Sequence, residues 1–387
     1  MPGEKFQLSQ RKPPLPIQAS HFKASSDCLP DFTGPKIAKT ETFRISFSLR
    51  NFAPRATKLQ NMDSGTQRNA LKASWLLFLA TVFWGFSFLG MKALGLEQQK
   101  LLPDGNSWFF AALSLVVRFG LSALLLLAWS RRTLTKVTRL EFEQGVGLGL
   151  VGGLGLLFQM DAVTYASAST VAFLTQCYCL FIPLFVAIRT RLWPTKNLML
   201  CCLMVVAGVA ILSKFNWQEM RLGRGEFEAI VASIFFTAQI LWLERPKFSR
   251  NNIQHVTIIM FVVNLISVLP VFFLVKPSWA EVAVAVNSTS VLVLYGILAI
   301  FCTLAAYTLM NYWQPHIEAT RAGLIYCAEP LFASVFALFL PGWISGLASI
   351  HYPNETITIN LLVGGGLITA ANILILMRAR RGPVPPV

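Results

Sequence analysis

Ten long apolar blocks occupy most of this 387-residue chain and constrain its fold more than any other feature. They lie at residues 74–95, 108–129, 145–164, 168–188, 197–213, 226–243, 254–275, 289–311, 321–341 and 357–377. Each approaches the roughly 17–25 apolar residues that a helix needs to cross a bilayer. They are too long and too continuous for the strands of a membrane barrel. Because a backbone in lipid must satisfy its own hydrogen bonds, the blocks predict an all-α integral membrane protein with ten transmembrane helices.

The composition supports lipid rather than water as the solvent of this chain. Hydrophobic residues make up 55% of the sequence and charged residues 13%, whereas a soluble domain carries about 25% charged residues. A large aqueous core would still need a polar surface around it. The composition therefore argues against a soluble enzyme, a disordered protein and a disulfide-rich secreted domain.

The net charge of +15 is distributed in a way that favours a membrane over nucleic acid. Most basic residues lie in the N-terminal segment or between the apolar blocks, as at the cytosolic borders of membrane spans. If the N-terminus is cytosolic, the inside loops hold more Lys and Arg than the outside loops. This bias predicts a multi-pass cell-membrane protein with both termini in the cytosol, with the lipid bilayer as a partner and no nucleic acid.

The first 72 residues are rich in Pro, Ser and Lys and show no sustained apolar period, so we expect them to be largely disordered. Three interpretations compete for this segment. It is a cytosolic tail, a basic organellar transit segment, or the result of a start assigned too early. We favour the last, with Met62 as the alternative start. Residues 379–387 are expected to form a short cytosolic tail.

The chain also resembles itself. A shift of 152 residues places Ala80–Trp84 over the similar Ala232–Phe236, and nearly the same shift aligns several later residues. The repeat predicts two halves, 73–214 and 225–378, with five spans each. Because an odd number of spans reverses the second half in the membrane, these halves form an inverted repeat, a frequent plan in secondary transporters.

Several short motifs follow one another along the blocks. They are Phe83-Trp84-Gly85-Phe86-Ser87-Phe88, Val117-Arg118-Phe119, Tyr165-Ala166-Ser167-Ala168-Ser169 with Ala172-Phe173-Leu174-Thr175, Thr303 with Gln314, and Ala319-Thr320-Arg321-Ala322 with Glu329-Pro330. In this order they resemble the EamA-type drug/metabolite transporters over about residues 74–377. That resemblance implies ten spans in two inverted five-helix EamA-type repeats. The chain departs from the family in its long N-terminal lead and at 341–358, where the family has a shorter loop.

The resemblance also implies a function. It indicates a secondary transporter, and more specifically an exporter, that moves small metabolites such as amino acids or related compounds by alternating access. A sugar-phosphate or nucleotide-sugar exchanger of the same superfamily is one alternative, although such a protein would need several basic groups in its late spans. The other is a membrane enzyme or scaffold that acts on lipids. The sequence contains no Walker A motif, and we expect no enzymatic activity.

Two charged residues within the apolar blocks are the leading site candidates, because charge at membrane depth is costly. Arg118 lies near the middle of the second block, where its forked donors suit a carboxylate or phosphate; the alternative is a tie to backbone carbonyls. We expect Glu329 about two turns into the ninth block, just before Pro330, which frees the carbonyl of Tyr326. Its carboxylate suits a proton or a cationic group, so Glu329 is the coupling candidate. Pairing with Arg321 is the alternative.

Uncharged side chains in the blocks complete the predicted substrate-binding set. Trp84 and Phe236 occupy equivalent positions in the two halves, as do Ser87 and Gln239. The remaining members are Gln159, Thr175, Tyr178, Tyr307 and Tyr326. Packing and interhelical hydrogen bonds, worth about 0.6–2 kcal/mol each, are the alternative for all of them.

Other residues receive structural interpretations. We expect Asp161 to reach the lipid headgroups and Lys92 to snorkel to the membrane surface. Gly145, Gly149 and Gly153, at four-residue spacing, predict a close helix contact. The triplet 364–366 offers a second close contact or, as an alternative, a homodimer face. The Cys and His residues show no metal-ligand spacing, so no metal, cofactor or catalytic residue is predicted.

Overall fold

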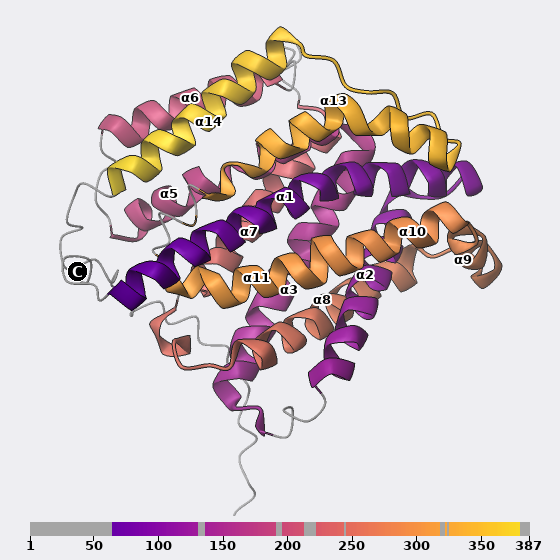
Figure 1. Ribbon diagram of the computed structural model, residues 1–387. Coiled ribbons are helices and arrows are strands. Elements are labelled where there is room, and N and C mark those ends of the chain that lie inside the picture. Colours follow the sequence, from indigo (N-terminus) through magenta and orange to yellow (C-terminus); the bar gives the residue numbers. More distant parts are fainter. Residues whose placement is uncertain are drawn as a thin grey trace, which may run out of the picture. The chain divides into compact units, whose positions relative to one another are not determined.

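The computed structural model describes residues 64–130, 136–190, 196–212, 222–243, 245–317, 322 and 325–379 (Figure 1). All of them belong to one compact unit of the chain, residues 49–387. Within these ranges the ordered elements are all helices, so the all-helical prediction is confirmed for this part of the chain. The alternative start at Met62, Arg321 and the C-terminal tail beyond Ala379 lie outside the described residues.

The described part of the first predicted half contains six helices. They are α1 (Ser64–Leu101), α2 (Ser107–Ser130), α3 (Arg139–Tyr165), α4 (Ala168–Thr175), α5 (Tyr178–Thr190) and α6 (Lys196–Leu212). The second contains longer and shorter elements. They are α7 (Arg224–Leu243), η2 (Pro246–Phe248), α8 (Ile253–Val275), α9 (Trp279–Val286), α10 (Thr289–Ile297), η3 (Leu298–Ala305), α11 (Ala306–Trp313), η4 (Gln314–His316), α13 (Glu329–Ala348) and α14 (Ile359–Ala379).

Several helix starts follow from local side-chain chemistry. Thr138 accepts a hydrogen bond from the backbone N–H of Glu141, whose side chain accepts one from the Thr138 N–H, so a capping box begins α3. Ser167 caps α4 and Asn252 caps α8 in the same general way. Such side chains satisfy N–H groups that have no partner within the helix.

Seven described helices are long and apolar enough to cross a membrane. They are Asn69–Leu101 within α1, then α2, α3, α7, α8, the continuous segment Thr289–His316, and α13. Three shorter apolar helices, Ala168–Ile182, Met199–Ile211 and Ile359–Leu374, lie at the fourth, fifth and tenth predicted blocks. The protein is therefore a multi-pass membrane protein, and the total of ten spans stays a prediction.

Two blocks that we expected to be continuous helices are different in the structure. The fourth is interrupted at Gln176 and Cys177, between α4 and α5. In the ninth, helical residues at 322, 325 and 326 are followed by a turn at 327–328, and α13 begins at Glu329, so this span is interrupted just before Glu329. Pro330 explains the difference, because a residue without an N–H fits the first turn of a helix and disrupts its interior.

Helices from the two predicted halves pack mainly against each other. The third helix, α3, contacts α7 and α8, while α2 contacts α8. Figure 1 shows α1 beside α13 and α6 beside α14, and both pairs are in contact. The interior thus lies between the halves rather than inside each of them.

The glycine stripe on α3 makes the close contact that its spacing predicts. A Cβ added at Gly145 would lie 2.6 Å from the Ile259 Cβ, and one added at Gly149 would lie 2.6 Å from the Val263 Cβ. Both partners belong to α8. Since real Cβ atoms do not approach so closely, only glycine allows α3 and α8 to pack at this separation.

Candidate functional site

Two helix interruptions meet at Gln176. Its Nε2 donates a hydrogen bond to the backbone carbonyl of Tyr326 over 3.2 Å and another to the Glu329 Oε2 over 3.1 Å. The Tyr326 carbonyl has no helical donor four residues on, because residue 330 is proline. The Gln176 side chain, at the break between α4 and α5, therefore supplies a hydrogen-bond donor to the free carbonyl that precedes α13.

Sequence reasoning missed Gln176, although a signal was present. It is a single amide in an apolar block, next to the predicted Thr175. Inside a membrane an amide needs hydrogen-bond partners, but its sequence position does not indicate which helix supplies them.

Glu329 is buried, with 9% of its surface exposed. Gln176 is its hydrogen-bond donor, and within the described ranges no Lys, Arg or His lies at ion-pair distance from its carboxylate. The suggested partner Arg321 lies outside these ranges. Glu329 is therefore a buried acid held by a neutral amide.

Aromatic rings surround the indole of Trp84. The Trp84 ring centroid lies 5.6 Å from that of Tyr307 and 5.6 Å from that of Tyr326, in edge-on arrangements. The Tyr326 hydroxyl donates to the Gln314 Oε1 over 2.7 Å. The Trp84 Nε1 is buried and has no hydrogen-bond partner among the residues described. A buried donor in this state is unusual and needs an explanation.

Arg118 is 1% exposed and contacts hydroxyl groups rather than backbone carbonyls. Its Nε donates to the Thr303 Oγ1 over 3.2 Å, and its Nη2 donates to the Ser87 Oγ over 3.4 Å. Thr303 lies in η3, a π-helical segment, a feature that is frequent at functional sites. The Arg118 Nη1 is buried without a partner in the described part of the chain.

These contacts join most of the predicted residues in one region. Ser87, which contacts Arg118, lies on α1 three residues after Trp84, whose ring contacts Tyr307 and Tyr326, and Gln176 links Tyr326 to Glu329. The buried Tyr178 begins α5 two residues after Gln176. We use the name central cluster for Trp84, Ser87, Arg118, Gln176, Tyr178, Tyr307, Tyr326 and Glu329. It places one cation and one anion around a group of aromatic rings.

Four predicted residues make other contacts. Gln159 donates to the Thr175 hydroxyl over 3.4 Å, and Thr175 donates to the carbonyl of Val171 in its own helix. Gln239 donates to the Leu148 carbonyl over 3.4 Å. Phe236 packs against α3, where its ring lies 3.0 Å from the Cβ position of Gly155. These contacts lie between helices or, for the Thr175 hydroxyl, within its own helix, and the part of these four residues in substrate binding stays a prediction.

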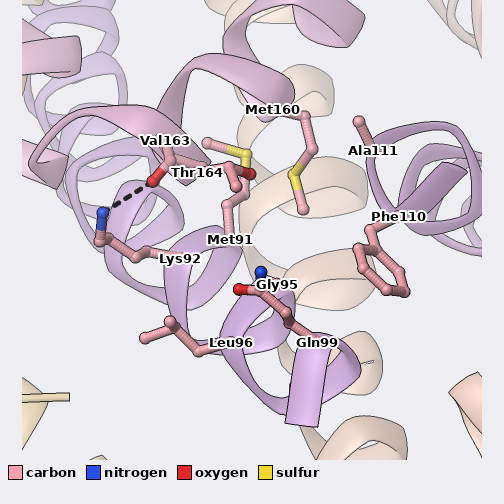
Figure 2. Close-up of a pocket in the computed structure, with 10 residues that line it drawn as sticks. All are labelled: Met91, Lys92, Gly95, Leu96, Gln99, Phe110, Ala111, Met160, Val163 and Thr164. Atoms are coloured by element: carbon pink, nitrogen blue, oxygen red, sulfur yellow. Dashed lines mark hydrogen bonds between the residues drawn. The ribbon is translucent and has the colours of Figure 1, made fainter. Parts of the chain in front are cut away.

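Lys92 points into the protein, so the expectation that it snorkels is wrong. Its Nζ donates to the backbone carbonyls of Val163 over 2.8 Å and Ala166 over 2.7 Å, at the C-terminal end of α3. Figure 2 shows Lys92 at a small pocket that α1, α2 and α3 line together. A cation is stabilised there because the last carbonyls of a helix lack helical donors and carry partial negative charge.

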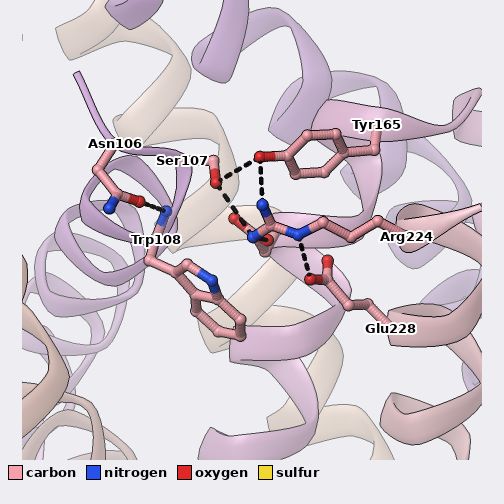
Figure 3. A network of polar contacts seen from close by, with 7 residues as sticks. Asn106, Ser107, Trp108, Tyr165, Arg224 and Glu228 are labelled. Atoms are coloured by element: carbon pink, nitrogen blue, oxygen red, sulfur yellow. Dashed lines mark hydrogen bonds and ion pairs between the residues drawn. The ribbon is translucent and has the colours of Figure 1, made fainter. Parts of the chain in front are cut away.

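Asp161 is fully buried and does not reach the headgroups, which corrects another expectation. Its Oδ2 lies 2.5 Å from the Arg224 Nη2, and the Arg224 Nε lies 2.8 Å from the Glu228 Oε1. Figure 3 shows the Arg224 guanidinium between Glu228 and Tyr165, whose hydroxyl accepts from Nη1 over 2.6 Å. We call Ser107, Asp161, Tyr165, Arg224 and Glu228 the Arg224 cluster.

Comparison with known proteins places the chain among transporters. Residues 71–214 match the EamA-like transporter family. An "Uncharacterized transporter" of Archaeoglobus fulgidus is 24% identical over 283 residues, which are 73% of this chain and 81% of that relative. An "Uncharacterized transporter" of Haemophilus influenzae is 33% identical over 112 residues, 29% of this chain and 62% of that relative.

One solved crystal structure aligns with 81% of this chain and 99% of its own, at 16% identity and a TM-score of 0.49. The match over residues 71–214, the two relatives named as transporters and the seven long apolar helices lead to one assignment. The chain is a membrane transporter, and its match to the EamA-like transporter family, of the drug/metabolite transporter superfamily, covers residues 71–214.

Proposed function

We propose that this transporter moves small amphipathic metabolites, such as amino acids or related compounds, by alternating access, and that the central cluster binds them. One observation carries the proposal. Arg118 and Glu329 are both buried, and neither has an ion-pair partner among the described residues. Opposite charges kept apart in a low-dielectric interior are costly, and a zwitterionic ligand between them would offset that cost.

Unused hydrogen-bond donors support the same proposal. The Nη1 of Arg118 and the Nε1 of Trp84 are buried without partners in the described ranges. Such groups lose their water without compensation, at a cost of about 1–3 kcal/mol each. A carboxylate is the ligand group that suits a guanidinium donor best. The rings of Trp84, Tyr307 and Tyr326 would contact its apolar part.

The helix interruptions also suit a transport site. Secondary transporters commonly bind substrate where discontinuous helices meet. Here the break at Gln176 and the start of α13 at Glu329 are joined by one hydrogen bond. Because a carboxylate can gain and lose a proton, Glu329 is the proposed coupling residue.

The packing of the helices supports the proposed inverted halves, 73–214 and 225–378. In two five-span halves, span one is equivalent to span six and span three to span eight. The contact of α3 with α7 joins spans three and six, and the contact of α1 with α11 joins spans eight and one, so the two contacts are equivalent. The contacts of α2 with α8 and of α6 with α14 each join equivalent spans. This reciprocity is what an inverted repeat would produce. Cytosolic termini, export as the direction and a homodimer stay part of the proposal.

Counterflow in proteoliposomes tests the proposed function. The purified full chain would be loaded with one unlabelled compound from a panel of amino acids, and entry of the labelled compound would be measured. We expect exchange of at least one compound, its loss in R118Q and its retention in R139Q, because Arg139 is an exposed arginine at the start of α3. Folded wild-type protein that exchanges no panel member would contradict the proposal.

The panel would also include sugar phosphates and nucleotide sugars. In the described part of the chain, Arg118 is the cation of the central cluster, whereas a phosphate dianion is usually bound by several basic groups. We therefore expect amino-acid-like compounds to exchange and phosphorylated ones to fail. The opposite result would establish the exchanger alternative.

A further inference from the structure

The Arg224 cluster joins α2, α3 and α7 through a second set of buried charges, distinct from the central cluster. Asp161 comes from α3 and Glu228 from α7, and their side chains are 0% and 6% exposed. Arg224, the first residue of α7, lies between them with a side chain that is 43% exposed. Two buried carboxylates thus share one partly exposed guanidinium, and Figure 3 shows its contact with Glu228.

The balance of charge in this cluster is incomplete. Two ionised carboxylates and one guanidinium leave a net charge of −1. Both carboxyl groups contact the same guanidinium, Asp161 at 2.5 Å from its Nη2 and Glu228 at 2.8 Å from its Nε. Two like charges so close together, and shielded from water, do not both ionise readily.

Each carboxylate also has an oxygen without a partner. The Asp161 Oδ1 and the Glu228 Oε2 are buried and accept no hydrogen bond from the described residues. A buried carboxylate oxygen normally accepts at least one. One proton held between the two groups would supply the missing donor and also neutralise the excess charge.

The groups around the cluster do not replace that proton. From α2, Ser107 accepts from the Arg224 Nη2 over 3.4 Å and lies 3.0 Å from the Tyr165 hydroxyl. From α1, Lys92 is held by two backbone carbonyls at the end of α3. In the described ranges, Arg224 is the cation at ion-pair distance from Asp161 and Glu228.

We propose that Asp161 and Glu228 together bind one proton, and that this proton stabilises the contact between α3 and α7 in the arrangement seen here. When the helices separate, water reaches both carboxylates and the proton leaves to bulk water. The proton therefore binds the packed arrangement more tightly than the separated one. By linkage, lower pH favours the packed arrangement and higher pH favours its opening.

Only the consequence for gating rests on the proposed transport function, since proton binding can be measured without any substrate. Infrared difference spectroscopy of the purified full chain detects the carbonyl band of a protonated carboxyl group. In an E329Q background, which removes the buried Glu329 carboxyl, we expect a band that titrates away at high pH and that is absent when D161N or E228Q is added, because either substitution makes the remaining cluster neutral without a proton. E226Q is the matched control, since Glu226 lies in the same helix turn and is partly exposed.

E228D keeps both carboxyl groups, so it should retain the band. It therefore distinguishes loss of the carboxyl group from misfolding caused by any change at residue 228. A band unchanged in D161N and E228Q, or lost in E226Q and E228D as well, would overturn the proposal whether or not any substrate is transported.

The pH profile of counterflow tests the gating consequence. For one proton, the opening equilibrium changes by up to about tenfold per pH unit. We expect wild type and E226Q to show this dependence, and D161N and E228Q to show a flatter profile. If the infrared band disappears in both variants but their profiles match wild type, the cluster binds a proton without controlling the gate, and that part of the proposal is wrong. A lack of transport in every protein would contradict the proposed function and leave the infrared result standing.

Discussion

The central cluster and the Arg224 cluster both bury charge between helices of the two predicted halves, but they satisfy it differently. In the central cluster, the described contacts of Arg118 and Glu329 are with hydroxyl and amide groups. In the Arg224 cluster, the guanidinium forms ion pairs with Asp161 and Glu228 directly. The first arrangement leaves a donor of Arg118 unused, and the second uses Arg224 to join α3 and α7.

The comparison separates a binding role from a tethering role. A guanidinium that is already paired with carboxylates has little left to offer an anionic ligand, and breaking the pair leaves a buried charge behind. A guanidinium held by neutral groups keeps its charge available. We therefore expect substitutions in the central cluster to change the rate of transport, and those in the Arg224 cluster to change stability and the pH dependence of counterflow.

The largest expected effect is that of R118Q on transport. Removing one partner of a buried charged hydrogen bond costs about 2–5 kcal/mol, so counterflow should fall by a factor of roughly 30 or more. Thermal unfolding of the same variant should change less, because the partners of Arg118 are neutral hydroxyl groups and no buried countercharge is left behind. R118K keeps the positive charge but lacks the forked donors of a guanidinium, so its counterflow should lie between those of wild type and R118Q. Counterflow at the wild-type rate in R118Q would show that Arg118 does not take part in substrate binding.

The next largest effect is that of R224Q on stability. Loss of one partner from a buried pair costs about 3–5 kcal/mol, and the exposure of Arg224 reduces this to about 1–3 kcal/mol. A lower unfolding temperature in detergent is the expected result. The double variant R224Q/E228Q removes one of the two acids as well and should regain part of the loss. If R118Q destabilised the protein as much as R224Q, the contrast between the clusters would fail.

E329Q should separate coupling from binding. A transporter that exchanges one proton can accumulate substrate by up to about tenfold per unit of pH gradient. We expect E329Q to lose this accumulation and to keep counterflow, which needs no net proton movement, at a weaker apparent affinity, because an amide oxygen can still accept from Gln176 and from a cationic group of the ligand but carries no charge. The matched control E226Q should keep both. Accumulation that persists in E329Q would exclude Glu329 as the coupling residue.

The smallest expected effect is that of W84F, which keeps an aromatic ring but removes the unpaired Nε1. One neutral hydrogen bond to a ligand is worth about 0.5–1.5 kcal/mol, so the apparent affinity in counterflow should weaken roughly two- to tenfold. Trp75 lies on the same helix with 67% of its surface exposed, so W75F should leave the affinity unchanged. Equal effects of the two substitutions would argue against a ligand contact at Nε1.

Local sequence patterns determined where several helices lie. The block at 108–129 and the helix Ser107–Ser130 agree to within one residue at each end, because apolar side chains stop where turn-forming and charged residues begin. The stripe of Gly145, Gly149 and Gly153 indicated a close helix contact for a similar reason. Arg118 and Glu329 were conspicuous because charge is rare in apolar blocks.

Only the tertiary structure decided which side chains meet. Gln176 and Glu329 are 153 residues apart in the chain, and Asp161 and Arg224 belong to different predicted halves. Lys92 and Asp161 looked like residues of the membrane surface until carbonyls and a guanidinium from distant elements proved to be their partners. Periodicity and composition report how each helix meets lipid, but the hydrogen-bond partner of a buried polar group is chosen by packing between helices. That choice depends on distances in space that residue order along the chain does not contain.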